Sequence, residues 1–228
     1  MTARLGEAGF LLPDRRARID EVVAGRTRTL TVVLEAFADP QNHNAVLRTA
    51  EALGVQEVHV VEGPQKRYDR NKKISQNADK WLDVVRWKDT AECLAALKAR
   101  GFAVYATWLG EGSCGLADLS FAGPVALVFG NEHAGVSEAA LAACDRRFAI
   151  PMSGFSQSLN VSVAAAISLA RAVERRVAER GRHGDLPEAE AEALRARFYT
   201  LSVKQRSRIA KAERAAERRA VHRATRGG

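Results

Sequence analysis

The feature that most constrains the fold is an alternation of short apolar runs with segments of helical pattern. The first run, Leu30–Leu34, is continuously apolar, as expected for a strand buried in a parallel sheet. Further strands are predicted at residues 58–61, 82–87, 102–107, 125–129 and 147–150, and helices at 13–25, 42–53, 90–100, 137–144, 159–180 and 187–198. This order predicts an α/β fold with an open, mainly parallel sheet.

The stretch from Ile150 to Leu169 changes character halfway along. Its first half holds Pro151, Ser153 and Gly154, which disfavour regular structure. Its second half has apolar residues at helical spacing and a run of alanines. Between them lies the polar segment 156–160, where the free N–H groups of a helix start can bind a small ligand. An ordinary capped helix after a turn explains the same pattern, and this stretch alone leaves both readings open.

Two other stretches bear on that choice, namely residues 37–54, with Asn42 and Arg48, and residues 125–138, with Gly130 and Glu132. Together the three resemble, in order and spacing, the motifs of SpoU-class RNA 2′-O-methyltransferases of the SPOUT superfamily, and the TrmH type in particular. The resemblance covers residues 15–172. It implies a deep C-terminal trefoil knot, which the physics of the sequence does not predict, and S-adenosylmethionine as the methyl donor.

The resemblance also implies roles for individual residues. Arg48, which alone would pass for a surface charge, matches the group that activates the ribose hydroxyl. Because arginine is always protonated, we expect it to stabilise the developing alkoxide while a nearby phosphate oxygen takes the proton. Asn42 would orient Arg48, and Glu132 would pair with Arg48 or hold the motif loops together. Ser158 and Asn160 would complete the catalytic site.

The cofactor pocket implied by the resemblance has six residues: Thr107, Gly130, Ile150, Met152, Ser158 and Leu159. Outside the family context, Ile150, Met152 and Leu159 would read as plain core. His43 and His133 are possible bases that the family does not require. No cluster has metal-ligand spacing, so no metal is expected.

Positive charge is concentrated at the C-terminus. Residues 195–228 hold eleven Lys and Arg against two Asp and Glu, more than the whole net charge of +8. Such a segment is typical of a polyanion partner, and nucleic acid is the first candidate. The residues predicted to bind RNA are Arg15, Arg16, Arg18, Lys66, Arg67, Lys204, Arg206 and Arg208. A solvated surface is the alternative for each of them.

The expected organisation is a basic helical extension (1–28), a methyltransferase domain (29–182) and a basic helical RNA-binding extension (183–228). By resemblance, the expected activity is 2′-O-methylation of tRNA, with a D-loop guanosine as the target. The alternatives are a ribosomal-RNA methyltransferase of the same class and a non-catalytic RNA-binding protein on this fold. The three cysteines and the lack of a long apolar run indicate a cytoplasmic protein without a membrane anchor.

We also expect a homodimer whose active site is shared across the interface. The helix after Leu159 has more small and apolar residues than one core needs. The face predicted to meet the partner consists of Val161, Ala164, Ala165, Ser168 and Arg171.

Overall fold

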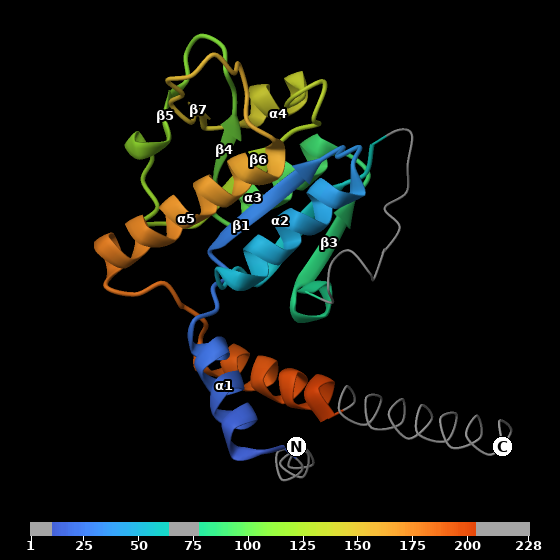
Figure 1. Cartoon of the computed structure of the whole chain (residues 1–228), viewed down its shortest axis with the longest axis vertical. Coiled ribbons are helices and arrows are strands. Elements are labelled where there is room, and N and C mark those ends of the chain that lie inside the picture. The colour runs from blue at the N-terminus through green and yellow to red at the C-terminus, as the bar shows by residue number, and fades with distance from the viewer. Residues whose placement is uncertain (1–10, 64–77, 204–228) are drawn as a thin grey trace, which may run out of the picture. The chain divides into compact units, whose positions relative to one another are not determined.

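The computed structural model describes residues 11–63 and 78–203 of the 228. Seven parallel strands form one sheet in the order β3-β2-β1-β6-β4-β7-β5 (Figure 1). The strands are β1 (Leu30–Glu35), β2 (Glu57–Val61), β3 (Asp83–Trp87), β4 (Ala103–Thr107), β5 (Cys114–Gly115), β6 (Val125–Phe129) and β7 (Arg146–Ala149). The predicted parallel α/β sheet is therefore confirmed.

Helices cover both faces of the sheet. They are α2 (Pro40–Ala52), α3 (Thr90–Ala99), α4 (Glu138–Ala143) and α5 (Val161–Arg180), with short 3₁₀ turns η2 (Ala78–Trp81) and η3 (Leu116–Asp118). One core packs α2 and α5 against one face of β1, and a second packs α3 and α4 against the other face. Alternate residues of β1 serve the two cores, since Val32 points into the first and Val33 into the second.

The predicted elements match the observed ones to within about two residues at most ends, and capping explains part of the difference. Helix α2 begins at Pro40 rather than Asn42, because Asp39 caps it by accepting the Gln41 N–H at 2.8 Å. Proline fits the first turn, where no N–H is needed. Strand β5 was not predicted, because two residues carry no readable alternation.

A second compact unit comprises residues 1–24 and 186–228, whereas the sheet and its helices lie in residues 25–185. Within the second unit the structure describes α1 (Pro13–Ala24) and a helix over residues 188–203. These two helices bond to one another through the Tyr199 hydroxyl, which donates to Asp20 Oδ1 at 2.6 Å. Phe198, the residue before Tyr199, is buried.

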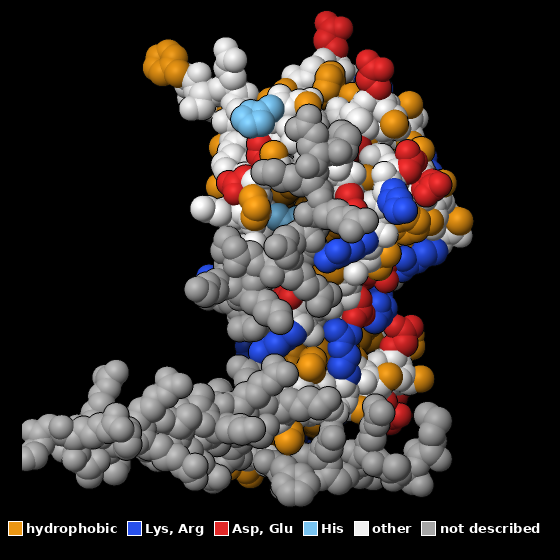
Figure 2. Space-filling view, turned by 90° about the vertical axis from the view of Figure 1, so that its right-hand side faces the viewer, with side chains coloured by type: hydrophobic (Ala, Val, Ile, Leu, Met, Phe, Trp, Pro, Cys, Tyr) orange, Lys and Arg blue, Asp and Glu red, His pale blue; other side chains and the backbone are white. Residues whose placement is uncertain are grey.

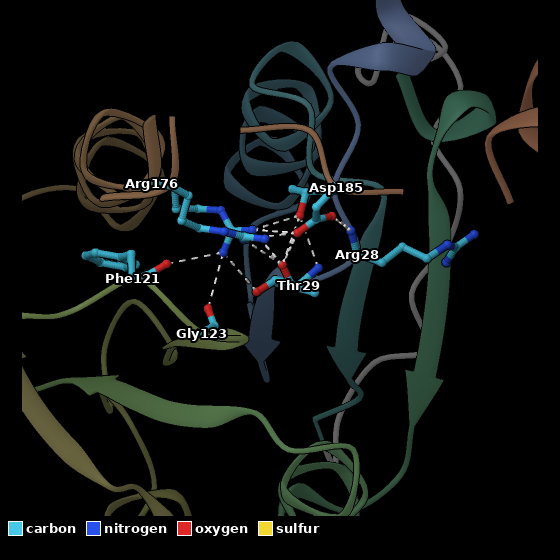
Figure 3. Close-up of polar contacts among 8 residues, drawn as sticks. Arg28, Thr29, Phe121, Gly123, Arg176 and Asp185 are labelled. Atoms are coloured by element: carbon cyan, nitrogen blue, oxygen red, sulfur yellow. Dashed lines mark hydrogen bonds and ion pairs between the residues drawn. The ribbon is translucent and has the colours of Figure 1, made fainter. Parts of the chain in front are cut away.

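A buried polar cluster lies at the amino-terminal end of β1. The Arg176 guanidinium of α5 is fully buried and donates to the backbone oxygens of Phe121 and Gly123 at 3.4 and 3.3 Å (Figure 3). It also forms an ion pair with Asp185 at 2.6 Å. Burial alone would raise the pKa of Asp185, but the hydroxyls of Thr29 and Thr27 and the charge of Arg176 outweigh it and hold that pKa below its ordinary value.

Candidate functional site

The three motif segments meet at the carboxyl end of the sheet. Strands β1, β6, β4 and β7 are successive neighbours; a motif segment follows each of β1, β6 and β7, and β4 ends in a residue predicted to bind the cofactor. These are residues 36–39 after β1, 130–137 after β6, Thr107 at the end of β4, and 150–160 after β7. Because all strands are parallel, these segments emerge at one edge, where open α/β sheets bind ligands.

A chain of side-chain hydrogen bonds joins the three motifs. The Asn42 Nδ2 group, in the first turn of α2, donates to Glu132 Oε1 at 3.0 Å. Asn42 Oδ1 accepts from Asn160 Nδ2 at 3.0 Å, and Asn160 Oδ1 caps α5 by accepting the Ser162 N–H at 2.9 Å. Three residues far apart in the sequence are thus brought together.

The Glu132 carboxylate determines which amide atoms donate and which accept along this chain of hydrogen bonds. Its carboxylate oxygens also accept the backbone N–H groups of Ala38 at 2.9 Å and Asp39 at 3.2 Å. Burial alone would raise the pKa of Glu132, but the hydrogen bonds from Asn42 and from these backbone groups outweigh it and hold the pKa below its ordinary value. An ionised carboxylate only accepts, so the Asn42 amide must turn its NH₂ toward Glu132 and its oxygen toward Asn160.

Arg48 and Ser158 lie outside this chain of bonds. Arg48 is exposed on α2, and among the described residues it has neither a hydrogen bond nor an ion pair. Ser158 is exposed in the segment that leads to α5. Glu132 therefore lies between the motif loops rather than against Arg48, and the Arg48 guanidinium is left accessible to a substrate.

The six residues predicted to bind a cofactor surround the same edge of the sheet. Ile150 is half-buried, and Met152 and Leu159 are each 36% exposed, so reading the last two as plain core is wrong. Gly130 cannot carry a side chain, because a Cβ there would lie 2.1 Å from Gly135 O. Partly exposed apolar side chains beside loop backbone groups suit an adenosine, which combines a flat apolar base with hydrogen-bonding groups. The residues present therefore fit S-adenosylmethionine.

Three of the eight predicted RNA-binding residues lie in the part of the chain that the structure describes. Arg15, Arg16 and Arg18 are exposed on α1, but Arg15 and Arg16 lie one turn before buried Ile19 and share its face of the helix, so the prediction that all three lie away from the apolar stripe is wrong. Arg18 bonds to Glu21 at 2.6 Å, and Arg15 donates to Ser202 at 3.5 Å. The other five predicted residues lie outside the described residues: Lys66, Arg67, Lys204, Arg206 and Arg208.

Basic side chains near the edge strand β3 are paired with carboxylates. Figure 2 shows Lys and Arg beside Asp and Glu on the face that carries this strand. Arg28 forms an ion pair with Asp83 at 2.5 Å, and Arg100 forms one with Glu57 at 2.6 Å. The positive charges of Arg28 and Arg100 are therefore compensated within the protein.

The predicted partner-facing surface of α5 needs a correction. Ala165 and Ser168 are fully buried, turned into the chain's own core, whereas Val161, Ala164 and Arg171 are half-buried. The large apolar residues exposed on α5 are Val163 at 46%, Ile167 at 39% and Val177 at 46%. The small side chains lie inward because α5 packs against α2, and small residues allow two helices to approach closely. The large apolar side chains that α5 leaves uncovered are therefore Val163, Ile167 and Val177.

Outside this region, a surface hollow of about 570 Å³ lies around the amino-terminal end of β7. Its lining includes Cys114, Cys144, Asp145, Arg146 and Arg147.

No group of three or more His, Cys, Asp or Glu within residues 11–63 and 78–203 is arranged to hold a metal ion. Over the same ranges, none of the helices combines the length and apolar character needed to cross a bilayer.

His43 follows Asn42 in α2 and is 4% exposed. Its ring packs edge-on against Phe37, with centroids 6.4 Å apart. Burial, with a smaller contribution from the charge of Arg86 and against the opposing charge of Glu132, lowers the pKa of His43 to about 4. The imidazole is therefore neutral at pH 7, and its burial keeps it from contacting a substrate.

This gives a prediction for acid stability. The unfolded chain takes up a proton on His43 near pH 6.5, whereas the folded chain does so only near pH 4. Stability should therefore fall as the pH drops from about 6.5 to about 4, by roughly 3 kcal/mol from this group. His43→Gln should lose that part of the pH dependence when urea midpoints are compared at pH 7 and pH 4.5. His133→Gln, an exposed change on a neighbouring loop, should behave like the native protein, and equal pH dependence in all three would contradict the assignment.

Comparison with known proteins places these features in a family. Residues 29–170 match the model of the SpoU rRNA Methylase family. The chain is 44% identical over 163 residues to the tRNA (guanosine(18)-2'-O)-methyltransferase of Thermus thermophilus, covering 72% of this chain and 84% of that protein.

Solved structures agree with this match. The crystal structure of the A. aeolicus TrmH/SpoU tRNA modifying enzyme superposes with a TM-score of 0.75 at 32% identity, covering 83% of this chain and 97% of that one. The SpoU methyltransferase AviRb from Streptomyces viridochromogenes, solved in complex with the cofactor AdoMet, gives a TM-score of 0.60 at 30% identity, covering 69% and 64% of the two chains.

Proposed function

Because the chain belongs to the SpoU rRNA methylase family, we propose that it transfers a methyl group from S-adenosylmethionine to a ribose 2′-hydroxyl of tRNA, with a D-loop guanosine as the target. The observation that carries the proposal is the chain of hydrogen bonds through Asn160, Asn42 and Glu132, which assembles the three motifs at one edge of the sheet. The choice of tRNA is supported by relatives named as tRNA (guanosine(18)-2'-O)-methyltransferases.

The residues of the site would have the following roles. Bound S-adenosylmethionine supplies an electrophilic methyl group. Ile150, Met152 and Leu159 would hold its adenosine, together with the backbone around Gly130. Arg48 would stabilise the alkoxide that develops on the ribose, and a phosphate oxygen of the RNA would take the proton, since a guanidinium cannot act as a base at neutral pH. Asn42, Glu132 and Asn160 would hold the motif loops in register.

Two architectural features belong to the same proposal. A C-terminal trefoil knot is supported by β7, which lies in the sheet between β4 and β5 although it follows both in the chain. A homodimer that shares its active site is supported by the apolar side chains exposed on α5 and by Arg48, which has no partner among the described residues. We assign catalysis to residues 29–182, and RNA binding to the extensions at 1–28 and 183–228.

One experiment tests the proposed function directly. The protein is incubated with total tRNA or with ribosomal RNA and labelled S-adenosylmethionine, and the modified nucleotide is mapped. Label on the ribose of a D-loop guanosine in tRNA is the expected result. Label in ribosomal RNA alone would favour the activity named in the family description. No label in either RNA, despite binding, would favour a non-catalytic RNA-binding protein.

The basic C-terminal residues give a second prediction. Residues 204–228 hold nine Lys and Arg against two Glu. Their removal should weaken tRNA binding and flatten the dependence of log affinity on log salt by about 0.7–0.9 for each of roughly four to six lost phosphate contacts. Truncation after Val203 keeps the buried Phe198 and Tyr199, so S-adenosylmethionine affinity should not change. Equal slopes for the two proteins would transfer the role to the basic residues of the 66–73 segment.

A further inference from the structure

Glu35, the last residue of β1, is a buried carboxylate at the carboxyl end of the sheet. It is 4% exposed, and it lies outside the three motif segments. Its Oε1 atom accepts from the hydroxyls of Thr90 at 2.5 Å and Ser137 at 2.6 Å, and its Oε2 atom accepts the Ser137 N–H at 2.9 Å. Glu35 therefore links β1 to the starts of α3 and α4, which lie behind the candidate site.

The proton positions in this cluster are determined by the geometry. Ser137 caps α4 by accepting the Ala140 N–H at 3.2 Å, so its single hydroxyl proton is free to point at Glu35. All three groups around Glu35 thus donate to it. An ionised carboxylate can accept all three, whereas an amide that turns its oxygen toward the Ser137 N–H would place its NH₂ against the two hydroxyls, which could then no longer donate to it and would have to turn to accept.

Ser137 is the end of the loop that carries Glu132, and this loop is internally rigid. Asn131 and Gly135 exchange two backbone hydrogen bonds, at 2.9 and 2.8 Å. Asn131 Oδ1 also accepts the N–H groups of His133 and Ala134. A loop closed in this way moves as one body, so its position depends on how its two ends are attached.

The two ends are attached to consecutive residues, Glu35 at the end of β1 and Ala36 directly after it. Glu35 binds Ser137 at the far end of the loop, and the backbone oxygen of Ala36 accepts from Asn131 Nδ2 at 2.7 Å at the near end. Ala36 has a φ of 53°, a left-handed conformation that costs free energy for a residue with a Cβ. After this turn come Ala38 and Asp39, whose N–H groups donate to Glu132.

We propose that Glu35 is a positioning residue for the methyl transfer. Its carboxylate holds the 131–137 loop, the loop holds Glu132, and Glu132 orients the Asn42 and Asn160 amides. The role rests on the proposed function and adds to it a residue that touches neither substrate nor cofactor. Glu35 acts on the reaction only through Glu132 and Asn42, which makes its effect separable from a general loss of stability.

The test is a kinetic double-mutant cycle on the full-length protein with tRNA. Glu35→Gln should lower kcat by about tenfold to 10²-fold, since small displacements of a catalytic group reduce rates on this scale, while KM for tRNA changes little. In an Asn42→Ala background the same substitution should have almost no further effect, because the side chain through which Glu35 acts on the site is already removed. Independent, multiplicative losses would overturn the proposal, as would full turnover by Glu35→Gln.

Two controls keep the result interpretable. Glu62→Gln removes a carboxylate just beyond the end of the neighbouring strand β2, paired with Arg86 at 3.8 Å, and should leave kcat unchanged. Ser137→Ala keeps the backbone N–H bond to Glu35 and serves if Glu35→Gln does not fold. It should lower kcat severalfold, again without additional effect in the Asn42→Ala background. An inactive native protein would refute the proposed function itself, whereas an active one with unchanged Ser137→Ala turnover would refute only the role of Glu35.

Discussion

Replacement of Arg48 by alanine is expected to lower turnover in tRNA methylation by on the order of 10²-fold or more, with S-adenosylmethionine affinity near that of the native protein. The guanidinium is exposed on α2, and no described residue neutralises it. Its full charge is thus available to an alkoxide developing on the substrate. Single-turnover kinetics with saturating cofactor would measure the loss, and equilibrium binding would measure the cofactor affinity.

Two comparisons sharpen this result. Arg48→Lys should recover little activity, because a point charge does not reproduce the planar fork of donors. Lys88→Ala removes an exposed charge between β3 and α3 and should keep full turnover. Arg48→Ala with turnover within about threefold of native would contradict the assigned role.

The same variant tests whether the active site is shared between subunits. Mixing Arg48→Ala chains with Asn160→Ala chains should restore part of the activity if each site takes Arg48 from one chain and Asn160 from the other. Light scattering should show a dimer, and Ile167→Glu on the exposed face of α5 should weaken it. A native monomer, or mixtures no more active than their components, would contradict the shared site.

Arg176→Ala should produce a large loss of stability, up to about 3–5 kcal/mol, because it removes the nearer of the two arginines that pair with the buried Asp185 carboxylate and leaves only Arg180, at 3.2 Å. It also leaves the backbone oxygens of Phe121 and Gly123 without their donor. Urea unfolding measures the change through the midpoint, provided that the m-value stays constant.

The neighbouring residue on the same helix is the matched control. Arg175 forms an ion pair with Glu179 at 2.5 Å, with both side chains partly exposed, and Arg175→Ala should cost less than about 1 kcal/mol. Similar losses for the two variants would mean that burial of the Arg176 cluster does not contribute as proposed.

The regular elements were predictable because their signals are local. The continuous apolar run of Leu30–Leu34 predicts a buried parallel strand, and β1 is one. Asn160, predicted at a helix start, is the N-cap of α5. The order and spacing of the three motif segments predicted the family, and the family model covers them. The roles of Arg48, Asn42, Glu132, Ser158 and Asn160 remain predictions.

Contacts between distant segments could not be predicted in this way. Glu35 and Arg176 are charged residues that a sequence pattern assigns to the surface, and their burial depends on donors and acceptors from other parts of the chain, such as Ser137 and Asp185. The left-handed turn at Ala36 has no composition signal, because Gly or Asn would be expected there.

The sequence by itself determined six of the seven strands that the structure describes, the helices α1 to α5, the motif spacing and the uneven distribution of charge, since each depends on neighbouring residues. Only the tertiary structure decided which face of α5 is buried, because that helix has apolar or small residues on more than one face. Packing against α2 selects Ala165 and Ser168 for the interior and leaves Val163 and Ile167 exposed. Periodicity identifies the faces of a helix, but the neighbour against which the helix packs determines which face is buried.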